Sequence, residues 1–159
     1  MTPVVSAASP RTSSPRTSSI PPALPRTPSS PHLPHRVLVV DDCADQRLII
    51  RKVLERSGIT VDEASSGFEG LKLYDKARRQ GTDYEVVLMD LRMPGMDGME
   101  TTRRMLGRKA AVRPRVVGVT AEPHEAFFAA CRSAGMEAIV SKPFRAGSLL
   151  VACMKRPCA

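Results

Sequence analysis

Four separate runs of apolar residues in this chain each end next to a residue that carries a charge or a hydroxyl group. The runs are Val37–Val40, Val86–Met89, Val116–Val119 and Ala138–Ser141, and they lead into Asp41-Asp42, Asp90, Thr120 and Lys142 respectively. Short runs rich in β-branched side chains predict strands that are buried on both faces of a sheet. In an open α/β sheet, ligands and reactive groups collect just beyond the carboxyl ends of the strands. We therefore expect these polar residues to share one edge of a sheet, although any one of them alone could simply cap a strand or a helix.

Segments with helical periodicity alternate with these runs. The predicted strands are 36–41, 59–64, 84–89, 115–120 and 137–141, and the predicted helices are 44–57, 67–80, 99–106, 123–134 and 145–155. Gly58 and Gly81 stand where glycines commonly follow the ends of helices. Five strands, each followed by a helix, predict an α/β fold with a parallel sheet, helices on both faces and right-handed crossovers.

Composition narrows the class of protein. A chain of 159 residues with 42% apolar residues can form one domain with a well-filled core. Its four cysteines include no C-x-x-C pair and no histidines at zinc spacing, so neither a disulfide framework nor a zinc site is indicated, and free thiols fit a reducing compartment. No apolar run is long enough to span a membrane, and no secretory signal is present. We expect a cytoplasmic protein with no membrane partner, and a nuclear location is also compatible with the sequence.

Residues 1–35 differ in composition from the rest of the chain. Residues 1–36 contain nine prolines, eight serines and no acidic residue. Such a segment buries too little apolar surface to offset the entropy lost on ordering, so we predict a disordered tail over 1–35 and a folded domain over 36–159. An arginine-containing, acid-free segment is also typical of organellar transit peptides, so organellar import stays open beside a plain solvated tail. Residues 1–36 carry four arginines, which account for half of the net charge of +8. The folded part has no DNA-binding motif, so nucleic acid is not the partner we expect.

Taken together, the four motifs resemble the receiver domain of two-component response regulators, the family of the bacterial chemotaxis receiver. The motifs are Asp41-Asp42, Asp90 within Leu-Met-Asp-Leu-Arg-Met-Pro-Gly-Met-Asp-Gly, Thr120 within Val-Thr-Ala, and Lys142 within Ser-Lys-Pro-Phe. The spacing of the motifs also suits that family: Asp90 lies 48 residues after Asp42, Thr120 lies 30 residues after Asp90, and Lys142 lies 22 residues after Thr120. The resemblance covers about residues 36–156. It implies a flavodoxin-like, doubly wound sheet of five parallel strands in the order 2-1-3-4-5.

The resemblance also implies a chemistry. Asp90 would take a phosphoryl group from a histidine kinase or a histidine-containing phosphotransfer protein and form an aspartyl phosphate. Lys142 would neutralise charge on the transferred group, and the hydroxyl of Thr120 would bind it once Asp90 is modified. A divalent cation, magnesium or manganese, would resolve the repulsion among clustered carboxylates. Its implied ligands are Asp41 (mostly through water), Asp42, Asp90 and the backbone carbonyl of Arg92.

The function expected from this resemblance is that of a stand-alone receiver in a phosphorelay, which stores or relays a phosphoryl group and signals to a protein target through partner binding. Such a protein phosphorylates and dephosphorylates itself and is not a turnover enzyme. One departure from the family pattern is Ile139, which stands where family members usually carry an aromatic switch residue. The bond between Lys142 and Pro143 fits a cis peptide in this family, but sequence alone leaves its isomer open.

Three alternatives compete with this hypothesis. A receiver-like scaffold that works without phosphorylation would not need the intact set of acidic residues, threonine and lysine. A haloacid-dehalogenase-like phosphatase needs a second acid two residues after its nucleophile. In this chain that position holds Arg92 after Asp90 and Ala44 after Asp42, and neither is an acid. A flavodoxin-type flavin carrier would need a phosphate-cradling loop after the first strand, and nothing there resembles one.

Overall fold

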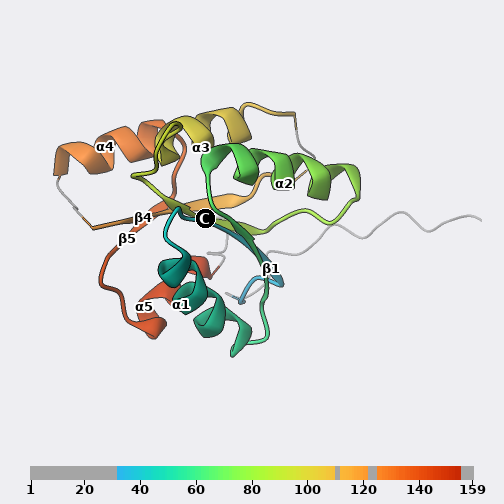
Figure 1. Ribbon diagram of the computed structural model, residues 1–159, viewed down its shortest axis with the longest axis vertical. Coiled ribbons are helices and arrows are strands. Elements are labelled where there is room, and N and C mark those ends of the chain that lie inside the picture. The colour runs from blue at the N-terminus through green and yellow to red at the C-terminus, as the bar shows by residue number, and fades with distance from the viewer. Residues whose placement is uncertain (1–31, 110–111, 122–124, 155–159) are drawn as a thin grey trace, which may run out of the picture.

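A computed structural model describes residues 32–109, 112–121 and 125–154 of the chain (Figure 1). The predicted tail over 1–35 therefore lies almost entirely outside the described residues. Five strands form one sheet in the order β2-β1-β3-β4-β5, as expected. They are β1 (Arg36–Val40), β2 (Thr60–Ala64), β3 (Val86–Asp90), β4 (Arg115–Thr120) and β5 (Ala138–Ser141). All four pairings are parallel, which confirms the predicted flavodoxin-like topology.

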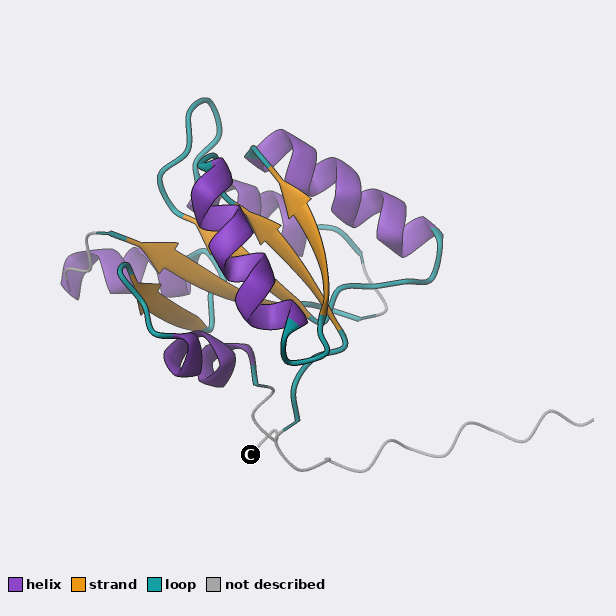
Figure 2. Cartoon of the chain, turned by 60° about the horizontal axis from the view of Figure 1, so that its bottom comes forward, coloured by secondary structure: helices purple, strands orange, loops and turns teal. Residues whose placement is uncertain are grey.

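Five helices connect and follow the strands. They are α1 (Ala44–Glu55), α2 (Gly67–Arg79), α3 (Gly98–Leu106), α4 (Glu125–Ser133) and α5 (Ala146–Cys153). Helices α2, α3 and α4 cover one face of the sheet, and α1 and α5 cover the other (Figures 1 and 2). Because neighbouring strands are parallel, each helix between them must carry the chain back to the edge where the strands begin. All the strands consequently end at one edge of the sheet, where the helices begin.

The alternation of side chains along β1 divides the core into two layers. Leu38 and Val40 pack under α2, α3 and α4 in one cluster, whereas Val37 and Val39 pack with residues of α1 and α5 in the other. Every residue of β3 is buried, as expected for a central strand covered on both faces. This two-sided burial fixes the register of the strand, because a slip of one residue would exchange the two layers.

Short polar residues fix the starts of two helices. The side chain of Ser66 accepts a hydrogen bond from the amide of Glu69 at 3.2 Å at the start of α2, and the Glu69 carboxylate accepts one in return from the amide of Ser65 at 2.7 Å. The side chain of Asp97 caps α3 by accepting from the amide of Glu100 at 2.7 Å. These bonds satisfy amides that have no partner inside the helix.

The observed bounds differ from the predicted ones by one or two residues in several elements. Helix α1 ends at Glu55 rather than at residue 57, because Ser57 and Gly58 bond to carbonyls three residues back and tighten the last turn. Strand β3 runs from Val86 to Asp90 instead of 84–89, so Asp90 is the last residue of the strand. Helix α4 begins at Glu125, and the predicted start at Pro123 lies outside the described residues. Among the described residues, no helix is long and apolar enough to cross a membrane.

Candidate functional site

The sheet brings most of the predicted polar residues together at the carboxyl edge of its strands. Asp41 directly follows β1, Asp90 ends β3, and Lys142 directly follows β5. One carboxylate oxygen from each of Asp41, Asp42 and Asp90 lies within 4.8 Å of the other two. Asp41 and Asp90 are buried and Asp42 is exposed, so the carboxylate cluster has two fixed members inside and one at the surface.

Lys142 provides the positive charge of this cluster. Its Nζ lies 2.8 Å from Oδ2 of Asp41 and 3.4 Å from Oδ1 of Asp90. Burial works to lower the pKa of Lys142, but its hydrogen bond to Asp41 and the charges of Asp41 and Asp90 outweigh burial and raise this pKa. Lys142 is therefore a permanently charged ammonium that contacts both buried carboxylates.

The surroundings of the Asp90 carboxylate disfavour its ionised form, so the pKa of Asp90 is raised. Burial is the largest cause that raises the pKa of Asp90, and the negative charge of Asp41 raises it further. Lys142 and a hydrogen bond from the amide of Arg92 work in the opposite direction without cancelling the rise. The Asp90 carboxylate is thus crowded and poorly hydrated, which favours any additional cation that can bind beside it.

The donor set fits a hard divalent cation. All three acidic side chains offer carboxylate oxygens, which magnesium prefers over nitrogen or sulfur ligands. The amide of Arg92 donates a hydrogen bond to Asp90, so the backbone of Arg92, whose carbonyl the resemblance implies as a ligand, lies beside the cluster.

Thr120 is the last residue of β4 and its exposed fraction is 1%. Its carbonyl accepts a hydrogen bond from the amide of Lys142 at 2.7 Å, and the preceding Val119 is the register partner of Asp90. Thr120 therefore lies at the same edge as the cluster, one residue beyond the level of Asp90. The peptide bond between Lys142 and Pro143, whose isomer the sequence left open, is cis.

The loop after β3 packs closely against the backbone of Asp90. A Cβ atom at Gly98 would lie 2.2 Å from the carbonyl oxygen of Asp90, so only glycine fits there. Gly95 adopts a φ of 81°, which also favours glycine. These two conformational requirements explain why Gly95 and Gly98 follow Asp90 so closely in the sequence.

Sequence reasoning missed one residue of this region. The guanidinium of Arg47, on α1, donates a hydrogen bond from Nη1 to the carbonyl oxygen of Asp41 at 2.6 Å. The only signal in the sequence is an arginine five residues after the acid pair, on a helix that carries several other charged residues. The contact depends on the path of the chain between β1 and α1 and was not predictable from spacing alone.

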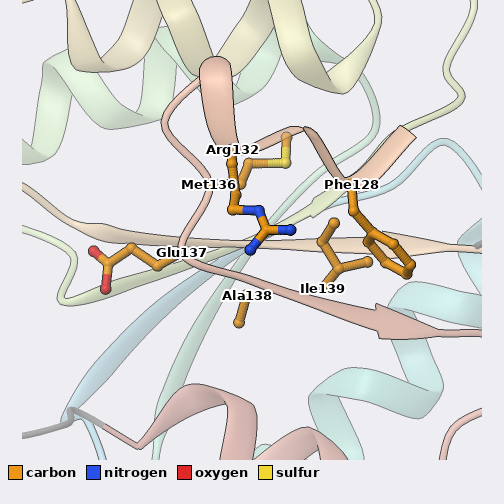
Figure 3. Close-up of a pocket in the computed structure, with 6 residues that line it drawn as sticks. All are labelled: Phe128, Arg132, Met136, Glu137, Ala138 and Ile139. Carbon is orange, nitrogen blue, oxygen red and sulfur yellow. The ribbon is translucent and has the colours of Figure 1, made fainter. Parts of the chain in front are cut away.

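Ile139 lies beside a shallow pocket of about 200 Å³ between α4 and β5 (Figure 3). Phe128, Met136 and Ile139 supply its apolar lining, and the guanidinium of Arg132 lies across it. The aromatic ring on this part of the surface therefore comes from α4 rather than from position 139 of β5.

Comparison with known proteins gives a consistent result. A sequence model of the response regulator receiver domain matches residues 37–153. The transcriptional regulatory protein ResD of Bacillus subtilis is 36% identical over 109 residues, which are 69% of this chain and 42% of that protein. The two-component response regulator 24 of Arabidopsis thaliana is 33% identical over 113 residues, 71% of this chain and 77% of that protein.

A solved structure of the chemotaxis protein CheY4 of Vibrio cholerae superposes with a TM-score of 0.67 at 27% identity, covering 73% of this chain and 92% of that one. The match covers less than half of the length of ResD, so the likeness concerns only part of that protein.

Proposed function

This chain belongs to the response regulator receiver domain family, and on that basis we propose that Asp90 accepts a phosphoryl group from a phosphohistidine donor in a reaction that depends on a divalent cation. The observation that carries the proposal is the cluster itself. A buried carboxylate at the end of a central strand is 3.4 Å from a lysine ammonium and within 4.8 Å of two further carboxylates.

In the proposed reaction, a carboxylate oxygen of Asp90 attacks the phosphorus atom of the donor. The new O–P bond forms as the P–N bond to the donor imidazole breaks, and the imidazole leaves with the bonding electron pair. Lys142 offsets the negative charge on the transferred phosphoryl oxygens, and the Thr120 hydroxyl donates a hydrogen bond to one of them. Water later hydrolyses the acyl phosphate and regenerates the carboxylate.

The residues that would hold magnesium or manganese are Asp42 and Asp90 directly, Asp41 mostly through water, and the carbonyl of Arg92. When bound, the cation supplies positive charge to the phosphoryl oxygens. Lys142 would supply its positive charge beside that of the cation, because its ammonium group contacts both buried carboxylates.

We further propose that the donor is a histidine kinase or a histidine-containing phosphotransfer protein, and that the modified domain acts by binding a protein target. The chain would be phosphorylated and regenerated without converting an external substrate, so we do not class it as a turnover enzyme. We expect these exchanges to take place in the cytoplasm, where free thiols such as Cys43 persist.

The experiment that tests this function is incubation with acetyl phosphate or phosphoramidate, with and without magnesium, followed by intact mass measurement. We expect wild type to gain one phosphoryl group only when magnesium is present, and Asp90→Asn to gain none. Asp97→Asn is the matched control, because Asp97 caps α3 and an asparagine caps a helix equally well. A wild-type protein that gains no phosphoryl group under any condition would refute the proposal and favour a phosphorylation-independent scaffold.

A further inference from the structure

Asp41 is held at all of its polar atoms by neighbouring elements. Its amide donates to the carbonyl of Ala64 at 3.1 Å, and its two carboxylate oxygens accept from the amide of Cys43 at 2.9 Å and from Lys142 at 2.8 Å. Its carbonyl oxygen accepts from Nη1 of Arg47 at 2.6 Å. The last of these bonds comes from a charged side chain and fixes the main chain itself.

Arg47 is in turn oriented by β2. Its Nε lies 3.7 Å from Oε1 of Glu63, and its side chain is only 16% exposed. Glu63 also forms an ion pair with Arg51 at 2.9 Å through its other carboxylate oxygen. Two arginines on α1 therefore share one carboxylate, but the Asp41 carbonyl bond belongs to Arg47.

The carbonyl of Asp41 belongs to the peptide group that joins Asp41 to Asp42. Residues 41–43 lie between β1 and α1, outside both elements, so no ladder of regular hydrogen bonds holds this peptide group. Asp42 is exposed, and the direction of its carboxylate depends on the orientation of the backbone that precedes it. A bond that pins the Asp41 carbonyl therefore also limits where the Asp42 carboxylate can point.

We propose that Arg47 is a positioning residue that holds the Asp41–Asp42 peptide so that both carboxylates are ready to bind a divalent cation. The inference rests on the proposed function for the identity of the cation. It adds a residue that touches neither cation nor phosphoryl group and acts through the backbone. Groups that orient metal ligands from behind commonly change metal affinity by 10- to 100-fold when they are removed.

The chain offers a matched control in Arg51. Arg47→Ala and Arg51→Ala remove the same charge from the same helix and the same carboxylate partner, but only Arg47→Ala releases the carbonyl of Asp41. We would measure magnesium affinity by titration calorimetry in both variants. We expect Arg47→Ala to weaken affinity by about 10-fold or more. We expect Arg51→Ala to change it by roughly 2-fold at most, because the half-buried ion pair of Arg51 with Glu63 leaves the bond from Arg47 to the Asp41 carbonyl in place.

A second readout needs no metal. The Cys43 amide donates to the Asp41 carboxylate, so its hydrogen exchange in the metal-free protein reports on the order of this loop. We expect Arg47→Ala to speed this exchange relative to wild type and Arg51→Ala to leave it unchanged. Arg47→Lys keeps the charge but lacks the planar fork that reaches both Asp41 and Glu63, so it should fall between wild type and Arg47→Ala in both measurements. It replaces Arg47→Ala in the comparison if the alanine variant does not fold.

The outcomes separate the two claims. Wild type that binds magnesium, with Arg47 variants that bind it equally well and exchange Cys43 at the wild-type rate, would overturn the role of Arg47 and leave the proposed function standing. Equal losses in the Arg47 and Arg51 variants would also overturn it, because they would show a general effect of charge. Wild type that binds no magnesium would instead overturn the proposed function.

Discussion

Replacing Asp90 by asparagine should make the metal-free protein more stable, although it removes the proposed phosphoacceptor. Carboxylate oxygens of Asp41, Asp42 and Asp90 lie within 4.8 Å of one another. Two like unit charges at that distance repel by about 3.5 kcal/mol at an effective dielectric constant of about 20. Exposed Asp42 is screened by water, so the repulsion between the two buried carboxylates, Asp41 and Asp90, dominates.

Lys142 opposes this repulsion but does not remove it. At 3.4 Å from Asp90 it contributes an attraction of about 5 kcal/mol on the same scale. Burying a charged carboxylate costs several kcal/mol, so burial and the repulsion by Asp41 together exceed this attraction. This balance agrees with the raised pKa of Asp90. Because Lys142 retains Asp41 at 2.8 Å in the variant, we expect Asp90→Asn to raise the free energy of unfolding by about 1–3 kcal/mol at pH 7.

The sign of the pH dependence follows from the raised pKa. The pKa of Asp90 in the unfolded chain is the ordinary aspartate value of 3.8, and burial raises the pKa of the folded residue above it. The unfolded state therefore binds fewer protons in this range, and the stability linked to Asp90 is present at low pH and lost as the pH rises through the folded pKa. The stability difference between wild type and Asp90→Asn should accordingly be small near pH 4 and reach its full size by pH 7.

The assay is thermal unfolding followed by far-ultraviolet circular dichroism in EDTA at both pH values, and then in magnesium. A gain of 1 kcal/mol corresponds to a rise in Tm of about 4 °C for a domain of this size. Magnesium at about 100 times its Kd should stabilise wild type by about 2.7 kcal/mol and the variant by less. The stability difference between the two proteins should therefore shrink or change sign in magnesium. An Asp90→Asn variant that is less stable than wild type in EDTA at pH 7 would refute this account of the cluster.

Two further predictions concern the scaffold. Gly67→Ala should lower the free energy of unfolding, measured by chemical denaturation, by about 1–3 kcal/mol, because its Cβ would lie 2.2 Å from Oγ1 of the buried Thr101. Gly147→Ala in α5 is the control: its Cβ meets no atom within 4 Å, so it should raise the free energy of unfolding by about 0.5–1 kcal/mol, and an unchanged stability in Gly67→Ala would contradict this packing. Brief alkylation followed by peptide mapping should modify exposed Cys43 but not Cys153, because Cys153 is fully buried and burial raises the pKa of its thiol to about 12; equal labelling of the two would contradict the described burial.

Much of the fold and part of the site could be predicted from the sequence. Apolar runs have a simple periodicity, and a polar residue at the end of a parallel strand can only lie at one edge of the sheet. Topology therefore predicts that the polar residues at these strand ends lie close together. The structure confirms this closeness for Asp41, Asp42, Asp90 and Lys142. The roles assigned to these residues, and to Thr120 and Arg92, stay predictions until the phosphorylation experiment is done.

Other features could not be predicted because they depend on distances between elements. The bond from Arg47 to the Asp41 carbonyl requires a particular turn between β1 and α1, and many turns are compatible with the same residues. The closeness of Gly67 to Thr101 depends on how α2 and α3 pack side by side. The pocket next to Ile139 likewise depends on the position of Phe128 on α4, which periodicity does not specify.

The parallel connection of the strands has an electrostatic consequence of its own. Helices α1, α3, α4 and α5 all begin at the edge of the sheet that holds the acid cluster (Figure 1). The positive ends of their peptide dipoles therefore face that edge, each equivalent to roughly half a unit charge. This background potential comes from the path of the main chain, so no side-chain substitution at the site removes it. It favours negative charge at this edge, and a place suited to an anionic group thus exists in the scaffold independently of which reactive side chains occupy it.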